Sequence, residues 1–328
     1  MTLNKDISVD VIIPCIDYDI YIDKTLSILT KSNLKTKIIL ISEDDKIIDK
    51  KILKNHVLKN VNISEKRNFG VSKSKSKYIA FIDSDAYPNE KWLNNAIQIL
   101  ETTGNDIGLI TGPDIAPKKE MTFSQWIVGE AHKSFFLSGF NNFRKNAFKK
   151  NYLVRMASSC NMVMKRNVYN EIGGMNEKVY IGEDIDFCLR IRSKYKILYS
   201  HNTLIYHRPR NFLKFLFQRL IYGFGVFKLI NFSNINLTKM YFGPFLFLIG
   251  SFLLLLLYFF SNNYLFILLL LSKYIIVFLE TIKISKNKLY SPIIFIVVLS
   301  GIFSFAIGSM ISFLNMNFKL KEIYRNRD

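Results

Sequence analysis

Two carboxylates at the end of an apolar run are the residues in this sequence with the clearest capacity for chemistry. Residues 78–82, YIAFI, predict a buried strand, and Asp83 and Asp85 follow it with only Ser84 between them. In an open α/β sheet, ligands bind at the carboxyl ends of the strands. Mg²⁺ and Mn²⁺ bind carboxylates, often together with substrate phosphates. The pattern predicts a site for a divalent cation and a diphosphate, although acids at strand ends also cap helices and form turns.

A second group of acids begins a predicted helix in residues 182–194, GEDIDFCLRIRSK. The spacing of its apolar residues places Glu183, Asp184 and Asp186 in the first turn. Acids there favour the helix dipole by about 0.3 to 1 kcal/mol each, which is the structural explanation. Three acids within four positions exceed what capping requires. A carboxylate within hydrogen-bond reach of a hydroxyl can also act as a general base.

The segments ahead of Asp83 must bring these acids to one edge of a sheet. Strands are predicted at residues 9–14, 37–41 and 57–61, with a helix at 21–30 and another that Ser64 caps. Strands that alternate with helices predict an α/β fold with a doubly wound, mostly parallel sheet, whose loops form a nucleotide crevice.

Charge and composition divide the chain of 328 residues into a more polar first part and an apolar tail. Hydrophobic residues make up 49% of the chain, but the long uncharged runs all follow Tyr241. The net charge of +19 suits phosphorylated substrates or anionic lipids. We do not expect a nucleic-acid partner, because no zinc pattern, basic helix or RNA-binding signature is present. Cys15, Cys160 and Cys188 are predicted to be reduced core residues, which favours the cytosol.

The tail predicts membrane attachment. Basic residues among Phe, Leu and Ile favour an amphipathic helix on the membrane surface, and three later runs are long enough to cross a bilayer core of about 30 Å. We therefore expect a catalytic domain at 1–207, an interfacial helix at 208–235 and a transmembrane region at 236–328, with spans at 241–260, 264–282 and 292–314.

Charged residues inside the second span raise a further question. Lys273 and Glu280 are seven residues apart and share a helical face. They either line a groove for a lipid phosphate or pair with other helices, and we favour the structural interpretation.

The topology predicted for the tail contains a conflict. If residues 1–207 are cytoplasmic, the basic loop at 283–288 returns to the cytoplasm, in agreement with the positive-inside rule. A third full crossing would place the basic residues of 319–327 outside. Either the rule fails there, or the third segment, which contains Gly301 and Gly308, is re-entrant.

Five blocks, in order along residues 9–207, resemble the successive motifs of a family 2 glycosyltransferase of the GT-A fold. The blocks are VDVIIPCID, IILISEDD, EKRNFGVSKSKSKYIAFIDSDAYP, SSCNMVMKRNVYNEIGGMNE and GEDIDFCLRIRSKYKILYSHNTLIYH. Their order and spacing make the resemblance more specific than any one motif. It implies a GT-A fold with a Rossmann-like sheet.

The resemblance also implies roles for individual residues. Asp184 would be the general base, supported by Glu183, and His207 either completes the metal site or is a structural residue. Either Glu43 or Asp44 replaces the family's paired aspartates near the nucleotide. The implied donor-binding residues are Pro14, Glu43, Asp44, Arg67, Asn68, Asp83 and Asp85, and the implied metal ligands are Asp83, Asp85 and His207.

The activity expected from this resemblance is inverting glycosyl transfer that depends on a divalent cation, Mn²⁺ or Mg²⁺. The donor would be a nucleotide sugar, and the acceptor a membrane lipid or polyprenyl-linked glycan at the bilayer. The location would be the cytoplasmic membrane, with several crossings and the catalytic domain facing the cytoplasm. The aromatic residues of 120–154 would form either the acceptor side or a flap.

Two alternatives remain. A processive polysaccharide synthase is disfavoured because residues 218–222, QRLIY, do not match the Q-x-x-R-W block of processive members. An inactive scaffold with the same fold would not need clustered, mutually repelling acids.

Overall fold

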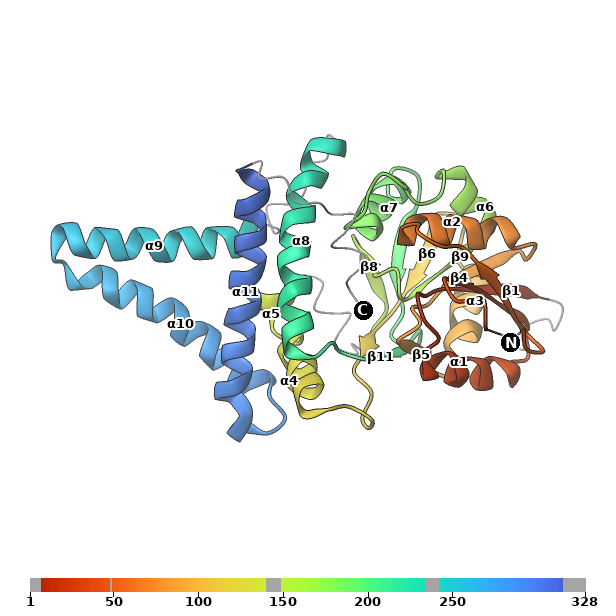
Figure 1. Ribbon diagram of the computed structural model, residues 1–328, viewed down its shortest axis with the longest axis horizontal. Coiled ribbons are helices and arrows are strands. Elements are labelled where there is room, and N and C mark those ends of the chain that lie inside the picture. The colour runs from red at the N-terminus through yellow and green to blue at the C-terminus, as the bar shows by residue number, and fades with distance from the viewer. Residues whose placement is uncertain (1–6, 48, 140–148, 234–241, 315–328) are drawn as a thin grey trace. The chain divides into compact units, whose positions relative to one another are not determined.

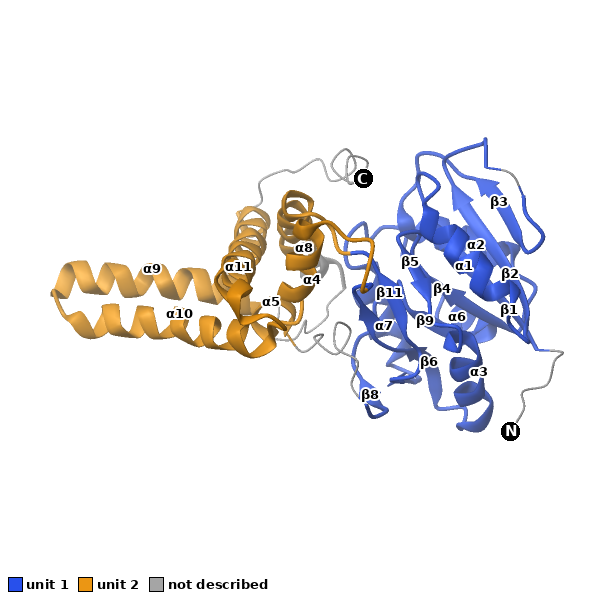
Figure 2. Cartoon of the chain, turned by 90° about the horizontal axis from the view of Figure 1, so that it is seen from below, with its two compact units in different colours: residues 1–117, 143–208, 328 blue, residues 118–142, 209–327 orange. Residues whose placement is uncertain are grey.

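The computed structural model describes residues 7–47, 49–139, 149–233 and 242–314 (Figure 1). The chain forms two compact units, one of residues 1–117 with 143–208 and one of residues 118–142 with 209–327 (Figure 2). In this division residues 118–139, which fall within the predicted catalytic domain of 1–207, are grouped with the C-terminal helices.

An eight-stranded sheet in the order β3-β2-β1-β4-β9-β6-β10-β8 forms the first unit. Its strands are β1 (Ser8–Pro14), β2 (Lys35–Ser42), β3 (Leu53–Val57), β4 (Tyr78–Phe81), β6 (Ile107–Thr111), β8 (Tyr152–Val154), β9 (Met162–Lys165) and β10 (Lys196–Tyr199). The neighbours β3, β2, β1 and β4 are parallel, while β9 is antiparallel to β4 and β6, and β8 is antiparallel to β10. The predicted α/β fold with a mostly parallel sheet is confirmed.

Each face of this sheet has its own apolar core. Val9, Val11 and Ile13 of β1 point into one core, and Ile12 points into the other, as alternation along a strand requires. The first core is covered by α1 (Ile20–Thr30) and α3 (Trp92–Thr102). The second is covered by α2 (Ile63–Lys73), α6 (Arg166–Glu171) and α7 (Glu183–Ile191) (Figure 1).

Two predictions for the segment that leads into α2 were wrong. The third strand is Leu53–Val57 rather than 57–61. Asn60 has a φ of 64°, which a strand does not accommodate, so the chain turns before Val61. Asn62, not Ser64, caps α2, and its side chain accepts a hydrogen bond from the Glu65 N–H.

The first unit also contains a small second sheet. It contains β5 (Ala86–Pro88), β11 (Ile205–His207) and β7 (Asp114–Ile115), with β11 in the centre. In its register His207 is opposite Ala86, and Ile205 is opposite Asp114. This pairing brings the chain after Asp85, the end of β11 and the chain after β6 together.

The second unit is helical. It comprises α4 (Phe123–Ala131), α5 (Phe135–Ser138), α8 (Phe212–Ser233), α9 (Gly243–Ser261), α10 (Tyr264–Ile284), a 3-10 turn (Lys288–Tyr290) and α11 (Ser291–Phe313). Three segments, Gly243–Ser261, Tyr264–Ile284 and Lys288–Phe313, are long and apolar enough to cross a membrane. Parts of the predicted interfacial and transmembrane regions, residues 234–241 and 315–328, lie outside the described residues.

Candidate active site

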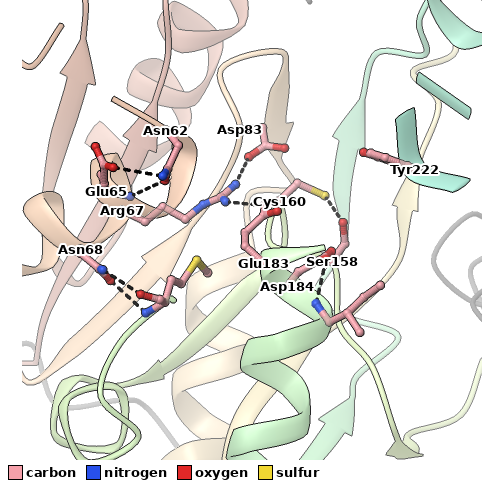
Figure 3. A network of polar contacts seen from close by, with 12 residues as sticks. Asn62, Glu65, Arg67, Asn68, Asp83, Ser158, Cys160, Glu183, Asp184 and Tyr222 are labelled. Atoms are coloured by element: carbon pink, nitrogen blue, oxygen red, sulfur yellow. Dashed lines mark hydrogen bonds and ion pairs between the residues drawn. The ribbon is translucent and has the colours of Figure 1, made fainter. Parts of the chain in front are cut away.

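A buried arginine joins the two acid groups that the sequence singled out (Figure 3). Arg67 lies on α2 and is 1% exposed. Its Nη2 donates to Asp83 Oδ1 over 2.9 Å, and its Nη1 donates to Glu183 Oε1 over 3.0 Å. Asp83 follows β4, and Glu183 is the first residue of α7. The guanidinium therefore fixes the start of α7 against the end of β4.

The three acids of α7 have different partners. Gly182, with a φ of 80°, precedes the helix. Glu183 is bound to Arg67, and the 3%-exposed Asp186 pairs with Arg190 one turn later, over 2.7 Å. Asp184 lies beside Glu183, and its Oδ1 accepts from the Ile185 N–H over 2.9 Å. The predicted helix start is confirmed, and Asp186 supports the helix rather than the site.

His207 lies between two carboxylates. Its Nε2 is 3.2 Å from Asp85 Oδ1, and its Nδ1 is 3.7 Å from Asp114 Oδ2. Arg208, the next residue, donates its backbone N–H to the Asp85 carbonyl over 3.1 Å and holds the two segments in register. Burial lowers the pKa of His207, but the Asp85 carboxylate opposes this most strongly, and the net result is a pKa well above the usual value.

Asp83, Asp85 and His207 each offer a ligand atom within 4.8 Å of the others. Two carboxylates with one imidazole suit Mn²⁺ or Mg²⁺, so the donor set fits the cation that the sequence predicted. Burial raises the pKa of Asp83, and the neighbouring Asp85 adds to this shift while Arg67 opposes it. A bound cation would favour the charged form of both carboxylates.

A second group, Asp114, Cys160 and His207, shares the histidine and is equally close together. Asp114 and Cys160 are buried, and the Cys160 Sγ is 3.7 Å from Asp114 Oδ2. Burial raises the pKa of the Cys160 thiol. Asp114 was not predicted from the sequence, although it follows the buried strand β6 much as Asp83 follows β4.

The ends of β1 and β2 meet at a buried lysine that the sequence analysis also missed. Lys66 Nζ donates to the Cys15 carbonyl over 2.7 Å and to Glu43 Oε1 over 2.9 Å. Cys15 follows Pro14, the last residue of β1, so the predicted donor residues Pro14 and Glu43 do lie together at this edge. Asp44 follows Glu43 in the sequence, and its carboxylate accepts a hydrogen bond from the Lys46 N–H.

Asn68 lies apart from this group. Its side-chain amide donates to the Met175 carbonyl over 2.9 Å and to Glu177 Oε1 over 2.8 Å, and its Oδ1 accepts from the Met175 N–H. Consecutive residues of a helix face different directions, so Asn68 does not share the orientation of Arg67. Its contacts anchor the turn that follows α6.

Comparisons with known proteins identify the family and the fold. A model of glycosyl transferase family 2 matches residues 10–173. Glycosyltransferase AglE of Haloferax volcanii is 22% identical over 177 residues, which are 53% of this chain and 54% of that protein. Pre-mycofactocin glycosyltransferase of Mycobacterium tuberculosis is 22% identical over 165 residues, which are 48% of this chain and 32% of that protein. The chain thus spans about half or less of the length of these curated relatives.

A solved structure resembles most of the chain. Mannosyltransferase PcManGT from Pyrobaculum calidifontis, in complex with GDP-Man and Mn²⁺, has a TM-score of 0.60 at 13% sequence identity, covering 94% of this chain and 88% of that chain. At this identity the likeness shows the fold, which is GT-A. The chain belongs to glycosyltransferase family 2.

Proposed function

We propose that the protein is an inverting glycosyltransferase that uses a divalent cation to transfer a sugar from a nucleotide-sugar donor to a membrane-held, lipid-linked glycan. The observation that carries this proposal is the Arg67 bridge. By binding Asp83 and Glu183 at once, it holds a cation-binding pair of aspartates next to the acidic start of α7. Cation ligands and a candidate base are what transfer from a nucleoside diphosphate requires.

The donor would lie along the sheet edge formed by the ends of β1, β2 and β4. The segment at Pro14, Glu43 and Asp44 is the proposed site for the nucleoside, with Asp83 and Asp85 beside the diphosphate. PcManGT, whose structure contains GDP-Man and Mn²⁺, supports a nucleotide sugar and a divalent cation for this chain as well.

Asp83, Asp85 and His207 would hold the cation, which as a Lewis acid supplies charge stabilisation for the diphosphate leaving group. Arg67 is already bound to two carboxylates, so we assign it to positioning rather than to direct phosphate binding. Its charge still lies beside the site and reduces the repulsion among the acids.

Asp184 is the proposed general base. It follows Glu183, which Arg67 holds at the start of α7, so its backbone is fixed beside the segment that carries Asp83. The Asp184 carboxylate would accept the proton of the acceptor hydroxyl as that oxygen attacks the anomeric carbon. A single displacement of this kind inverts the configuration at that carbon.

The long apolar helices support an acceptor held at the membrane. The excess of cations would bring the chain to anionic lipid, and a cytoplasmic catalytic unit is proposed because the basic loop at 283–288 would then also be cytoplasmic, as the positive-inside rule prefers.

The first test is donor turnover by the purified full-length protein in detergent. UDP-, GDP- and dTDP-sugars would be supplied with Mn²⁺ or Mg²⁺, with EDTA as the control and membrane lipid extract as the acceptor. We expect release of one nucleoside diphosphate that EDTA abolishes. No turnover with any donor would contradict the proposal and favour an inactive scaffold.

The base assignment is tested by Asp184→Asn, which should abolish transfer while donor binding, measured by calorimetry, remains. Asp106→Asn is the matched control, because Asp106 pairs with Lys196 on the surface and should leave transfer unchanged. Transfer that survives in Asp184→Asn would show that another group takes the proton.

A further inference from the structure

The helical unit contains an apolar hairpin that has the dimensions of a membrane crossing. Helices α9 and α10 have 19 and 21 residues, so they are about 28 and 32 Å long. A bilayer core is about 30 Å thick. The connection at Asn262 and Asn263 is polar and uncharged, with Asn262 in the left-handed region at a φ of 48°. Leu253, Phe260 and Leu268 are among the side chains at least half exposed.

Contacts within the hairpin explain the charge in the middle of α10. Lys273 Nζ donates to the Phe247 carbonyl over 3.1 Å and to Ser251 Oγ over 3.0 Å, both on α9. Near the tip, the rings of Tyr258 and Tyr264 are 5.8 Å apart. The two helices are therefore antiparallel neighbours, and Lys273 serves as a contact between them, which confirms the structural interpretation of this residue.

The other end of the hairpin is its charged base. Glu280, seven residues after Lys273, accepts from Ser134 Oγ over 2.5 Å and from the Phe135 N–H over 2.6 Å. The exposed Lys283 and Lys286 follow within two turns. Charged side chains are stable at the membrane–water boundary and costly in the core, so this base marks the level of the interface.

Helix α11 runs across this base rather than along the hairpin (Figures 1 and 2). Near its start, Phe295 contacts Phe278 of α10, with ring centres 5.4 Å apart. Near its end, Phe313 contacts Phe245 of α9, with ring centres 6.3 Å apart. Two residues that are 18 positions apart on α11 thus contact the hairpin near its base, one on α10 and the other on α9.

The partner that keeps α11 in this position is α8. A Cβ on Gly308 would lie 1.9 Å from the Leu220 carbonyl oxygen, and one on Gly223 would lie 2.0 Å from the Phe305 carbonyl oxygen. The two backbones can touch only because both positions are glycine. Gly301 likewise faces the Phe215 ring. The glycines are packing positions in an unbroken helix and not breaks that make the segment turn back.

We propose that the chain crosses the bilayer twice, through α9 and α10, and that α8 and α11 lie in the plane of the membrane interface as a platform at the base of the hairpin. A helix that lies across the base cannot also be parallel to the hairpin and cross the bilayer with it. The inference rests on the membrane attachment proposed above but not on any catalytic role.

The charges support this arrangement. The loop after α10 and the end of α11 at Leu314 would be on the same side of the membrane, so the positive-inside rule does not require the chain to cross again after the basic loop. The conflict that a third crossing creates does not arise. On α11, Ile296 and Ile307 are exposed, whereas Ile294 and Val298 are buried in the unit, so one apolar face of the helix remains available to lipid.

The number of crossings can be measured with single cysteines and a membrane-impermeant maleimide, in right-side-out and inverted vesicles containing the full chain. The three native cysteines are buried, so the unmodified chain is the blank. Ser261→Cys reports the hairpin tip, Lys286→Cys reports the base, and Leu314→Cys reports the end of α11. We expect Leu314→Cys to be labelled from the same side as Lys286→Cys, and Ser261→Cys from the opposite side.

Labelling of Leu314→Cys from the same side as Ser261→Cys would establish a third crossing and overturn the proposal. Labelling of all three variants from one side would also overturn it.

Spin labels give a second measurement that does not depend on vesicle orientation. Oxygen accessibility should peak in the middle of the α9 series Leu246, Leu253 and Phe260, and should stay level along the α11 series Ile293, Ser300 and Ile307. A peak at Ser300 would contradict an in-plane helix.

Both measurements are independent of turnover. A chain that gives the expected labelling but transfers no sugar would keep the membrane arrangement and refute the catalytic proposal, and the reverse result would do the opposite.

Discussion

The two aspartates of the D-S-D sequence are held in different ways. Asp83 is bound to a permanent cation of the protein, the 1%-exposed guanidinium of Arg67. Asp85 faces His207, whose charge depends on protonation, with Asp114 on the far side of the ring. The Asp83 side thus has a fixed positive charge that two carboxylates share, whereas the positive charge opposite Asp85 is present only while His207 is protonated. We infer from this difference that Arg67 fixes the position of Asp83 at any pH, whereas the contacts of Asp85 change when His207 loses its proton or when a cation binds.

The largest effect is expected from removing the fixed cation. Arg67→Met would leave Asp83 and Glu183 without their shared partner, and breaking a buried ion pair in this way costs about 3 kcal/mol or more. The loss of alignment between β4 and α7 should also lower turnover by about a hundredfold. Thermal unfolding of the purified protein and the donor assay measure the two effects.

Arg67→Lys is the informative companion variant. It keeps the charge but lacks the planar fork that reaches two carboxylates, so it should recover part of the stability and little of the turnover. Lys196→Ala, which removes a surface ion pair, is the control and should change stability by less than about 1 kcal/mol. If Arg67→Met keeps both stability and turnover, the two sides of the site do not differ as we infer.

A smaller effect is expected on the other side, from Asp114→Asn. The Asp114 carboxylate favours a proton on His207 Nδ1, so that a cation held with Asp85 would displace only the proton on Nε2. Loss of such a partner typically weakens metal binding by about 10- to 100-fold. Mn²⁺ binding followed by electron paramagnetic resonance measures this directly, without a donor.

Cys160→Ser is the control for that variant, and we expect it to bind Mn²⁺ as the unmodified chain does. If Cys160→Ser weakens Mn²⁺ binding as much as Asp114→Asn, the ion is held by Asp114, Cys160 and His207 instead, and the role assigned to Asp85 is wrong.

The smallest effect is expected where an ion pair lies on the surface. Lys50 donates to Asp23 over 2.5 Å, and this hydrogen bond lowers the pKa of Asp23. A lowered pKa stabilises the fold at pH values above the ordinary Asp value of about 3.9, and this contribution is lost as the pH falls through the folded-state pKa. Both side chains are more than 40% exposed, so Asp23→Asn should cost less than about 1 kcal/mol at neutral pH.

The measurement for Asp23→Asn is thermal unfolding at neutral and acid pH. The difference from the unmodified chain should shrink as the pH is lowered. A difference that grows at acid pH would show that the carboxylate is not the source of the effect.

The strands β1, β2 and β4 and the start of α7 were predicted from the sequence because they depend on local patterns. Apolar runs such as 78–82 and acids after Gly182 carry their signal within a few residues. The partners of Arg67 could not be predicted, because they are 16 and 116 residues away and their meeting depends on strand order. Asp114 was missed for a similar reason, since β7 is only two residues long and has no periodicity.

The orientation of α11 was also beyond the sequence. Its composition is the same whether it crosses a bilayer or lies on it, and only its contacts with α8, α9 and α10 distinguish the two. For Asn68 the family motif predicted donor contact, whereas its hydrogen bonds in the structure are to Met175 in the turn after α6, so donor contact by Asn68 stays a prediction.

The short connection after β11 limits the distance between the candidate active site and α8. Only residues 208–211 separate His207 from Phe212, the first residue of α8. An extended chain covers at most about 3.6 Å per residue, so these two Cα atoms remain within about 18 Å of each other whatever position the two units take. If α8 lies on the membrane surface, His207 therefore stays within about 18 Å of the start of α8, which is at the level of the headgroups. An acceptor anchored in the bilayer would then need to extend only a few sugar lengths to reach the sugar-transfer site.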